Sequence, residues 1–275
     1  MVKLLDQAGV PGVTSACYRS LFAGILFVPI AWPHRRTLRR VHVGWPIGAL
    51  LTFTVMTACY VIGNTMTEAA NVITLQYTSP IWVFLLAPLL LRERPALQDT
   101  LVLSVAMAGV AIIFFGQATA AWPALTIGLA SGLGYGAVTV TLRGMKPVTP
   151  TAVVAVNFFG SGLLLLLPVA AWGAFLLTGH QFALMLLLSV VQMALPYLLF
   201  SWALRRVEAH RAALIVLLEA ILNPVWTYLI IGEKVPTATL VGGPLILLSV
   251  VGWILLTWRR EAANRRREYT SDPLE

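Results

Sequence analysis

The most informative shortage in this sequence is of charge. Only 11% of its 275 residues are charged, whereas 59% are hydrophobic. A soluble domain carries about 25% charged and roughly 45–50% apolar residues. So few charges cannot cover a soluble surface. The composition therefore predicts an all-α polytopic membrane protein that lies in the lipid bilayer.

Chemically reactive side chains are scarce too. The only cysteines, Cys17 and Cys59, lie inside apolar segments and are predicted to pack there rather than to form a disulfide or a metal pair. The four histidines lie in loops or at segment ends without metal-ligand spacing, and no catalytic triad or carboxylate pair is present. We therefore expect no metal, no cofactor and no enzymatic activity.

Nine apolar segments are long enough to cross a bilayer, which takes about 20 residues each. They cover residues 12–33, 43–65, 69–91, 98–116, 122–143, 149–172, 182–204, 208–232 and 237–258. A polar tail with five arginines, residues 259–275, follows the last segment and is expected to be frayed.

The net charge of +8 indicates membrane orientation rather than nucleic-acid binding, because the basic residues form short runs between the apolar segments. If the spans alternate and the loop at 35–40 is cytoplasmic, most of the 19 lysines and arginines fall on the cytoplasmic side. This bias predicts a multi-pass protein of the cell inner (plasma) membrane with a cytoplasmic C-terminus.

An internal repeat is visible when the chain is shifted by 140 residues. Glu68 then falls on Glu208 at the start of a span, and Glu93 falls on Glu233 at its end. The shift predicts a first repeat at 1–116 with four spans and a second at 122–258 with five. We expect the chain to lack the first helix of a ten-helix protein; the alternative is a genuine nine-helix protein. Because five spans per repeat is an odd number, the second repeat crosses the membrane in the opposite orientation to the first. Such inverted repeats are typical of secondary transporters.

Two segments resemble a known family. Residues 69–80 (AANVITLQYTSP), followed at 90–95 by LLRERP, and the second copy with Glu219-Ala220 and Gly232-Glu233, are similar to the drug/metabolite transporter superfamily, EamA type. The resemblance implies ten helices in two inverted five-helix repeats and export of amino acids or other small metabolites. Where the family usually has Glu-Pro, this chain has Glu219-Ala220.

Polar side chains at helical spacing inside the spans predict a central cavity, because lipid cannot satisfy them. Five spans carry such stripes, whereas 98–116 and 237–258 carry little and are expected at the lipid-facing periphery. Ordinary bonding between helices is the alternative for any single side chain. The substrate-binding candidates are Tyr77, Tyr135, Gln192, Glu219, Asn223 and Trp226.

Three charged residues have distinct predicted roles. Glu219 is the only acid deep inside a span, so it is a candidate partner for a substrate ammonium or a proton-coupling site, with a structural carboxyl as the alternative. Arg19 either extends to the outer interface or binds a substrate carboxylate or gates the outer mouth. Glu93 lies among basic residues and is predicted to pair locally rather than to contact substrate.

Residues Gly128, Gly132 and Gly136 form two consecutive Gly-xxx-Gly steps, which predict close approach by another helix. Together these patterns predict a secondary-active or facilitative carrier that exports a small metabolite, such as an amino acid, by alternating access. Its expected partners are the bilayer, the substrate, protons and a second copy in a homodimer, but no nucleic acid. The alternative function is a non-transporting membrane scaffold.

Overall fold

The chain folds almost entirely into helices. The computed structural model describes residues 10–66, 69–117, 122–173, 175–222, 225, 229 and 237–271, and these residues contain no strand. The helices are α2 (Gly12–Ala31), the 3₁₀ helix η1 (Trp32–Arg40), α3 (Gly44–Met66), α4 (Ala69–Gln76), α5 (Ser79–Leu90), α6 (Leu97–Gln117), α7 (Trp122–Gly144), α8 (Pro150–Trp172), α9 (Gly179–Leu188), the π-helix η2 (Ser189–Ala194), α10 (Leu195–Ala203), α11 (Ala209–Val216) and α13 (Thr237–Ser271).

Eight stretches within the described residues are long and apolar enough to cross a membrane. The all-helical, polytopic class predicted from composition is thus confirmed. The predicted span at 208–232 lies partly outside the described residues. The predicted fraying after residue 258 is wrong for the backbone, because α13 continues as a helix to Ser271.

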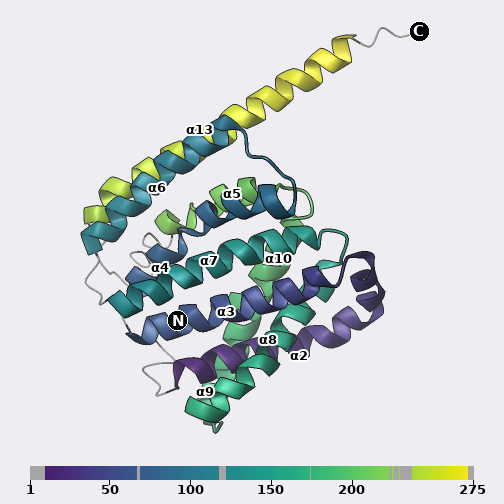
Figure 1. The fold of residues 1–275 in the computed structure, drawn as a ribbon, viewed down its shortest axis with the longest axis vertical. Helices are drawn as coiled ribbons and strands as arrows, with labels where there is room; N and C mark the ends of the chain where they lie inside the picture. The colour runs from purple at the N-terminus through teal and green to yellow at the C-terminus, as the bar shows by residue number, and fades with distance from the viewer. Residues whose placement is uncertain are drawn as a thin grey trace. The chain divides into compact units, whose positions relative to one another are not determined.

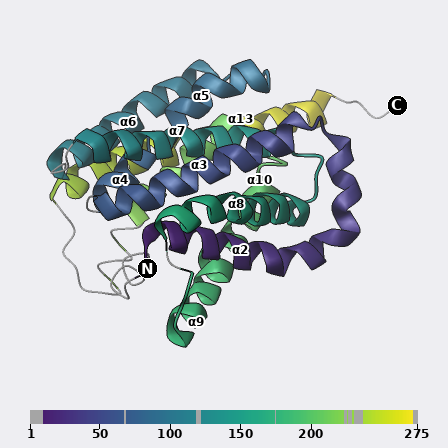
Figure 2. The ribbon, with the colours of Figure 1, turned by 60° about the horizontal axis from the view of Figure 1, so that its bottom comes forward.

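The helices form two compact units, and each unit contains segments from both sequence repeats. Unit 1 comprises residues 1–94 and 118–213, and unit 2 comprises residues 95–117 and 214–275. In unit 1, α2 packs on α8 and α3 on α7, as Figures 1 and 2 both show. In unit 2, α6 lies along α13 (Figure 1).

Unit 2 depends on glycine at the crossing of its two helices. A Cβ built on Gly109 would meet the carbonyl oxygen of Gly242 at 2.6 Å, and one on Gly242 would meet that of Gly109. Apolar lipid supplies no hydrophobic drive for helix association, so close van der Waals approach through small residues holds such pairs together. Close backbone contact at Gly109 and Gly242 therefore holds α6 and α13 together within unit 2.

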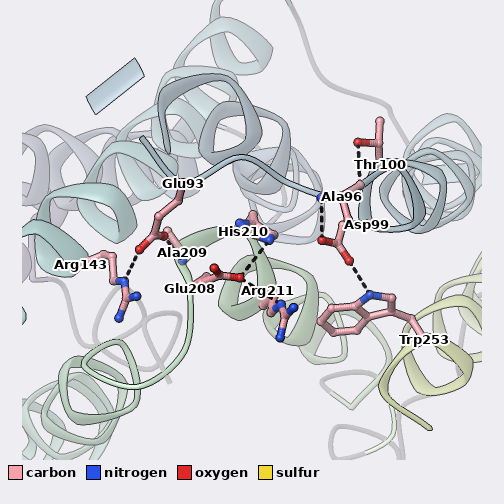
Figure 3. A network of polar contacts seen from close by, with 10 residues as sticks. All are labelled: Glu93, Ala96, Asp99, Thr100, Arg143, Glu208, Ala209, His210, Arg211 and Trp253. Atoms are coloured by element: carbon pink, nitrogen blue, oxygen red, sulfur yellow. Dashed lines mark hydrogen bonds and ion pairs between the residues drawn. The ribbon is translucent and has the colours of Figure 1, made fainter. Parts of the chain in front are cut away.

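A second contact in unit 2 lies near one end of the pair. Asp99, which is 1% exposed, accepts hydrogen bonds from the backbone N–H of Ala96 at 3.0 Å and from Trp253 Nε1 at 2.6 Å (Figure 3). The carboxylate thus satisfies a donor at the start of α6 and ties α6 to α13.

Replacing Asp99 by alanine should destabilise this pair, because it leaves a buried indole N–H and a helix-terminal N–H without this acceptor. Each lost hydrogen bond to a charged group costs about 1.5–3 kcal/mol. We expect a lower thermal unfolding midpoint in detergent and a change in Trp253 emission. Ser249→Ala is the matched control on α13, because Ser249 Oγ bonds only the carbonyl of Ile246 in its own helix. An equal loss in both variants would contradict the assigned role.

One predicted span is discontinuous. Residues 69–91 form α4 and α5, which are separated by a turn at Tyr77 and Thr78. Pro80 has no N–H with which to bond the carbonyl of Gln76, and in the turn the Thr78 hydroxyl donates to the carbonyl of Leu75 at 2.7 Å. A second turn lies at Leu217 and Leu218, after α11, 140 residues further along the chain. The two breaks therefore occur at the spacing of the sequence repeat.

The glycine stripe of α7 packs against this broken helix, which confirms the predicted close approach. A Cβ on Gly132 would lie 2.5 Å from Thr78 Oγ1 and 2.6 Å from the Leu75 carbonyl oxygen, and one on Gly136 would lie 2.8 Å from the Ser79 carbonyl oxygen. Gln76 Nε2 donates to Ser131 Oγ at 3.0 Å beside the break. The irregular backbone is thus covered by protein, as a membrane interior requires.

Candidate functional site

Arg19 is buried in the packing of unit 1. It is on the second turn of α2 and is only 6% exposed. Its Nε atom has no hydrogen-bond partner, and no ion pair among the described residues involves Arg19. A buried guanidinium without a partner is costly, so this geometry favours the predicted binding role over extension to the interface.

Further buried polar side chains without partners lie on the helices α2, α3 and α8, which pack against one another. Buried oxygen atoms on three neighbouring helices form no hydrogen bond in the structure; with Arg19 they make up what we term the Arg19 polar layer: Ser15 and Ser20 on α2, Thr57 on α3, and Asn157 and Ser161 on α8. Native interiors leave only a few such atoms unsatisfied. Five in one packed helix triplet that also carries a buried cation make these helices a candidate place for a polar ligand that supplies the missing partners.

The packing of α2 on α8 sets the level of this layer. Cys17 Sγ contacts the Gly162 carbonyl oxygen at 3.4 Å, and a Cβ on Gly24 would lie 2.5 Å from the backbone of Phe159. Ser20 falls between these contacts on α2, and Ser161 falls between them on α8. The two hydroxyl groups therefore occupy the same level of the bundle, and Ser20 is the residue next to Arg19 in the sequence.

Aromatic side chains border the layer. Phe53, Phe158 and Tyr197 pack edge to face, with ring centroids 4.8–5.4 Å apart, and the Tyr197 hydroxyl contacts Met56 Sδ at 3.4 Å. Tyr60 and Tyr197 are the titratable groups close enough to interact electrostatically with Arg19. The cation thus has phenol groups within electrostatic range, and no described carboxylate forms an ion pair with it.

This arrangement suits one chemistry in particular. A guanidinium presents donors in a planar fork that matches both oxygens of a carboxylate, and hydroxyl groups can bond further polar atoms of the same molecule. In a buried site the ligand anion neutralises a charge that the protein leaves uncompensated. The layer is therefore a candidate site for a small molecule that bears a carboxylate.

Three of the other predicted binding residues belong to unit 1, and two of these, Tyr77 and Tyr135, lie on the broken helix and on α7, which packs against it. Tyr77 is buried in the turn between α4 and α5. Tyr135, on α7, is half-buried and packs against Phe200 with ring centroids 6.3 Å apart. Both pack among helices, and no described contact joins either of them to Arg19.

Of the four remaining predicted binding residues, the structure describes Gln192 and Glu219 only. Gln192 is exposed and lies within the π-helix η2, a local irregularity often found at functional sites. Glu219 follows the second break directly; its side chain is exposed, and no described ion pair includes it. Asn223 and Trp226 lie outside the described residues.

Sequence reasoning missed several members of the site. Tyr197 gave no signal, because one tyrosine in an apolar span is ordinary. The pairs Ser15–Arg19 and Asn157–Ser161 are each spaced by four residues and lie on one helix face. This four-residue spacing could have indicated from the sequence that each pair lies on one helix face.

The fold and the layer define a multi-pass helical membrane protein with broken helices and an interior polar site, the class to which many membrane carriers belong. Comparison with known proteins agrees. The sequence profile of the EamA-like transporter family matches residues 1–115 and 122–255. The chain belongs to this family of membrane transporters, which confirms the resemblance inferred from sequence.

Similarity to individual proteins points the same way. The chain is 30% identical over 224 residues to a protein of Archaeoglobus fulgidus described as an uncharacterized transporter; the match covers 79% of this chain and 78% of the relative. A solved crystal structure superimposes with a TM-score of 0.77 over 94% of this chain and 93% of the other, at 14% identity. That likeness is one of fold alone.

Proposed function

We propose that this protein is a secondary-active or facilitative carrier that exports a small carboxylate-bearing metabolite, such as an amino acid. The observation that carries the proposal is Arg19, buried and unpaired within the Arg19 polar layer. Transport proceeds by alternating access between the two sequence repeats, in the inner membrane with a cytoplasmic C-terminus. Membership of the transporter family and the broken α4–α5 segment support this reading.

Each part of the layer has a defined task in this proposal. Arg19 binds the substrate carboxylate through two parallel hydrogen bonds. The hydroxyl groups of α2, α3 and α8 bond the polar atoms next to it. The aromatic group of Phe53, Phe158 and Tyr197 packs against the apolar part of the substrate. Energy comes from the gradient of the substrate or of protons.

The proposal is tested by counterflow in proteoliposomes loaded with unlabelled solute. The panel pairs each labelled amino acid with the amine that lacks its carboxylate, and adds hydroxy acids of similar size. We expect saturable uptake of at least one carboxylate-bearing solute and none of its paired amine. A pH gradient that accelerates this flux would identify proton coupling. Equal uptake of acids and amines, or no saturable flux of any acid, would contradict the proposal.

A further inference from the structure

A single carboxylate joins the two sequence repeats at one end of unit 1. Glu93 follows α5 and belongs to the first repeat. Its Oε1 accepts from Arg143 Nε at 2.7 Å, and its Oε2 accepts from the backbone N–H of Ala209 at 3.0 Å; both partners belong to the second repeat (Figure 3). Glu93 therefore pairs with a basic residue of the protein, as predicted, but its partners lie 50 and 116 residues away in the chain.

Arg143 extends this contact to another helix end. Its Nη1 donates to the carbonyl of Leu204, directly after α10, at 2.7 Å. The guanidinium thus lies at the negative end of α10, and the carboxylate lies at the positive end of α11. We call Glu93, Arg143, Leu204 and Ala209 the Glu93 clasp. The charge on each side chain matches the helix end that it meets.

The clasp is shielded from solvent and lies over apolar packing. The side chains of Glu93 and Arg143 are 16% and 10% exposed. Next to them, Val83 and Ala87 of α5, Val140 of α7, and Ala209 and Ala213 of α11 form one buried apolar cluster. This cluster also joins the first repeat to the second. Separating α5 from α11 would therefore require breaking the clasp and exposing the cluster.

The backbone next to the Glu93 clasp is strained at one residue. Arg92, which precedes Glu93, has a φ of +59° and is the only non-glycine residue with positive φ in the described part of the chain. This left-handed conformation costs a non-glycine residue about 1 kcal/mol or more. Glycine, Gly232, stands at the corresponding position of the second repeat. The strained turn places Glu93 between α7 and α11.

We propose that the Glu93 clasp is the gate that closes this end of the protein between the repeats. The inference rests on the proposed function, because alternating access requires contacts between the repeats at each side to break in turn. The clasp lies where α5 and α7 end, on the side that the basic residues predict to be cytoplasmic. Its opening would admit substrate to the carrier from that side.

The test measures access to the apolar cluster beneath the clasp. Ala213→Cys, 4% exposed in the parent, is introduced into full-length protein that also carries Cys59→Ala. The rate of its modification by a membrane-impermeant maleimide is measured in proteoliposomes by peptide mass spectrometry. Glu93→Gln should raise this rate by about tenfold or more, because a neutral amide forms weaker bonds to Arg143 and Ala209.

Two controls accompany the measurement. Glu208→Gln changes a half-exposed neighbour of Ala209 that pairs with His210 and Arg211, and should leave the rate unchanged. Cys17, fully buried between α2 and α8, reports unfolding and should remain unmodified in every variant. If Glu93→Gln exposes Cys17, Arg143→Lys is used instead, because lysine cannot hold Glu93 and Leu204 in the same forked geometry.

The outcomes separate this proposal from the proposed function. An unchanged maleimide rate at position 213 in a folded clasp variant overturns the gate, whether or not the protein transports substrate. A raised rate together with faster or more symmetrical flux supports it. A raised rate in a protein that transports no solute supports a clasp that controls access at this end but refutes the carrier function, because labelling requires no substrate.

Discussion

Replacing Arg19 by glutamine should lower carboxylate flux by about 100-fold while leaving the protein folded. The buried guanidinium is the one cation in the Arg19 polar layer, and the loss of a desolvated, doubly bonded charge pair typically costs about 2–5 kcal/mol. Arg19→Lys should retain part of the flux, because an ammonium keeps the charge but not the fork. Initial rates of counterflow measure both variants.

Stability of the substrate-free protein gives a second readout. Arg19 is buried without a partner, so a neutral side chain removes a desolvation penalty. We therefore expect the thermal midpoint of Arg19→Gln to equal or exceed that of the parent, and substrate to stabilise only the parent. Arg36→Gln, in exposed η1, is the matched control. A lower midpoint with proportionate loss of flux would assign Arg19 a structural role instead.

Adding one methyl group at Gly132 should disrupt the packing of α7 on the broken helix. In Gly132→Ala the new Cβ would lie 2.6 Å from the backbone oxygen of Leu75. This oxygen belongs to the backbone of α4, so it can move away only if α4 itself shifts. Overpacking of this kind costs about 1–3 kcal/mol. We expect the unfolding midpoint in detergent to fall by roughly 3–10 °C, and flux to fall with it.

The matched control is Gly252→Ala on α13. No atom lies within 4 Å of a Cβ built there, so the same substitution adds no clash. Alanine in a helix interior is favoured over glycine by roughly 0.5–1 kcal/mol, so the midpoint should stay level or rise. Opposite signs at the two positions would show that close approach, not glycine itself, matters at Gly132. Equal effects would contradict the role assigned to the α7 stripe.

The two breaks in the helices connect fold to mechanism. The turn at Tyr77 and Thr78 and the turn at Leu217 and Leu218 lie 140 residues apart. Transporters built from inverted repeats commonly place such discontinuous helices near their substrate sites, where free backbone groups face a cavity. Tyr77 therefore stays a substrate-binding prediction, and Glu219, next to the second turn, stays a candidate for proton coupling.

Much of the fold could be predicted from hydropathy because lipid leaves little choice. Every backbone group in a bilayer must be satisfied within its own segment, so an apolar run of about 20 residues becomes a helix. The predicted segment 149–172 and α8, Pro150–Trp172, agree to one residue. The break in 69–91 was harder to predict, because Pro80 also fits a kinked but continuous helix.

The candidate site was only partly predictable. Arg19 stood out as a charge within a span, but sequence left open whether it reaches the interface. Ser20, Asn157 and Ser161 were missed, because single small polar residues in spans more often bond within their own helix. Only the packing of α2 on α8 brings Ser20 and Ser161 to one level. Glu93 shows the same limit, since charge pattern cannot reveal a partner 50 residues away.

The sequence by itself determined the membrane class, the positions of most spans and the family, because these depend on local composition and on short motifs. The tertiary structure decided that Arg19 is buried without a partner, that the α7 glycines face α4 and α5, and that Glu93 pairs with Arg143. These features depend on which helix faces of distant segments meet. Between helices in an apolar solvent, close packing and a few polar contacts make that choice, and hydropathy does not encode them.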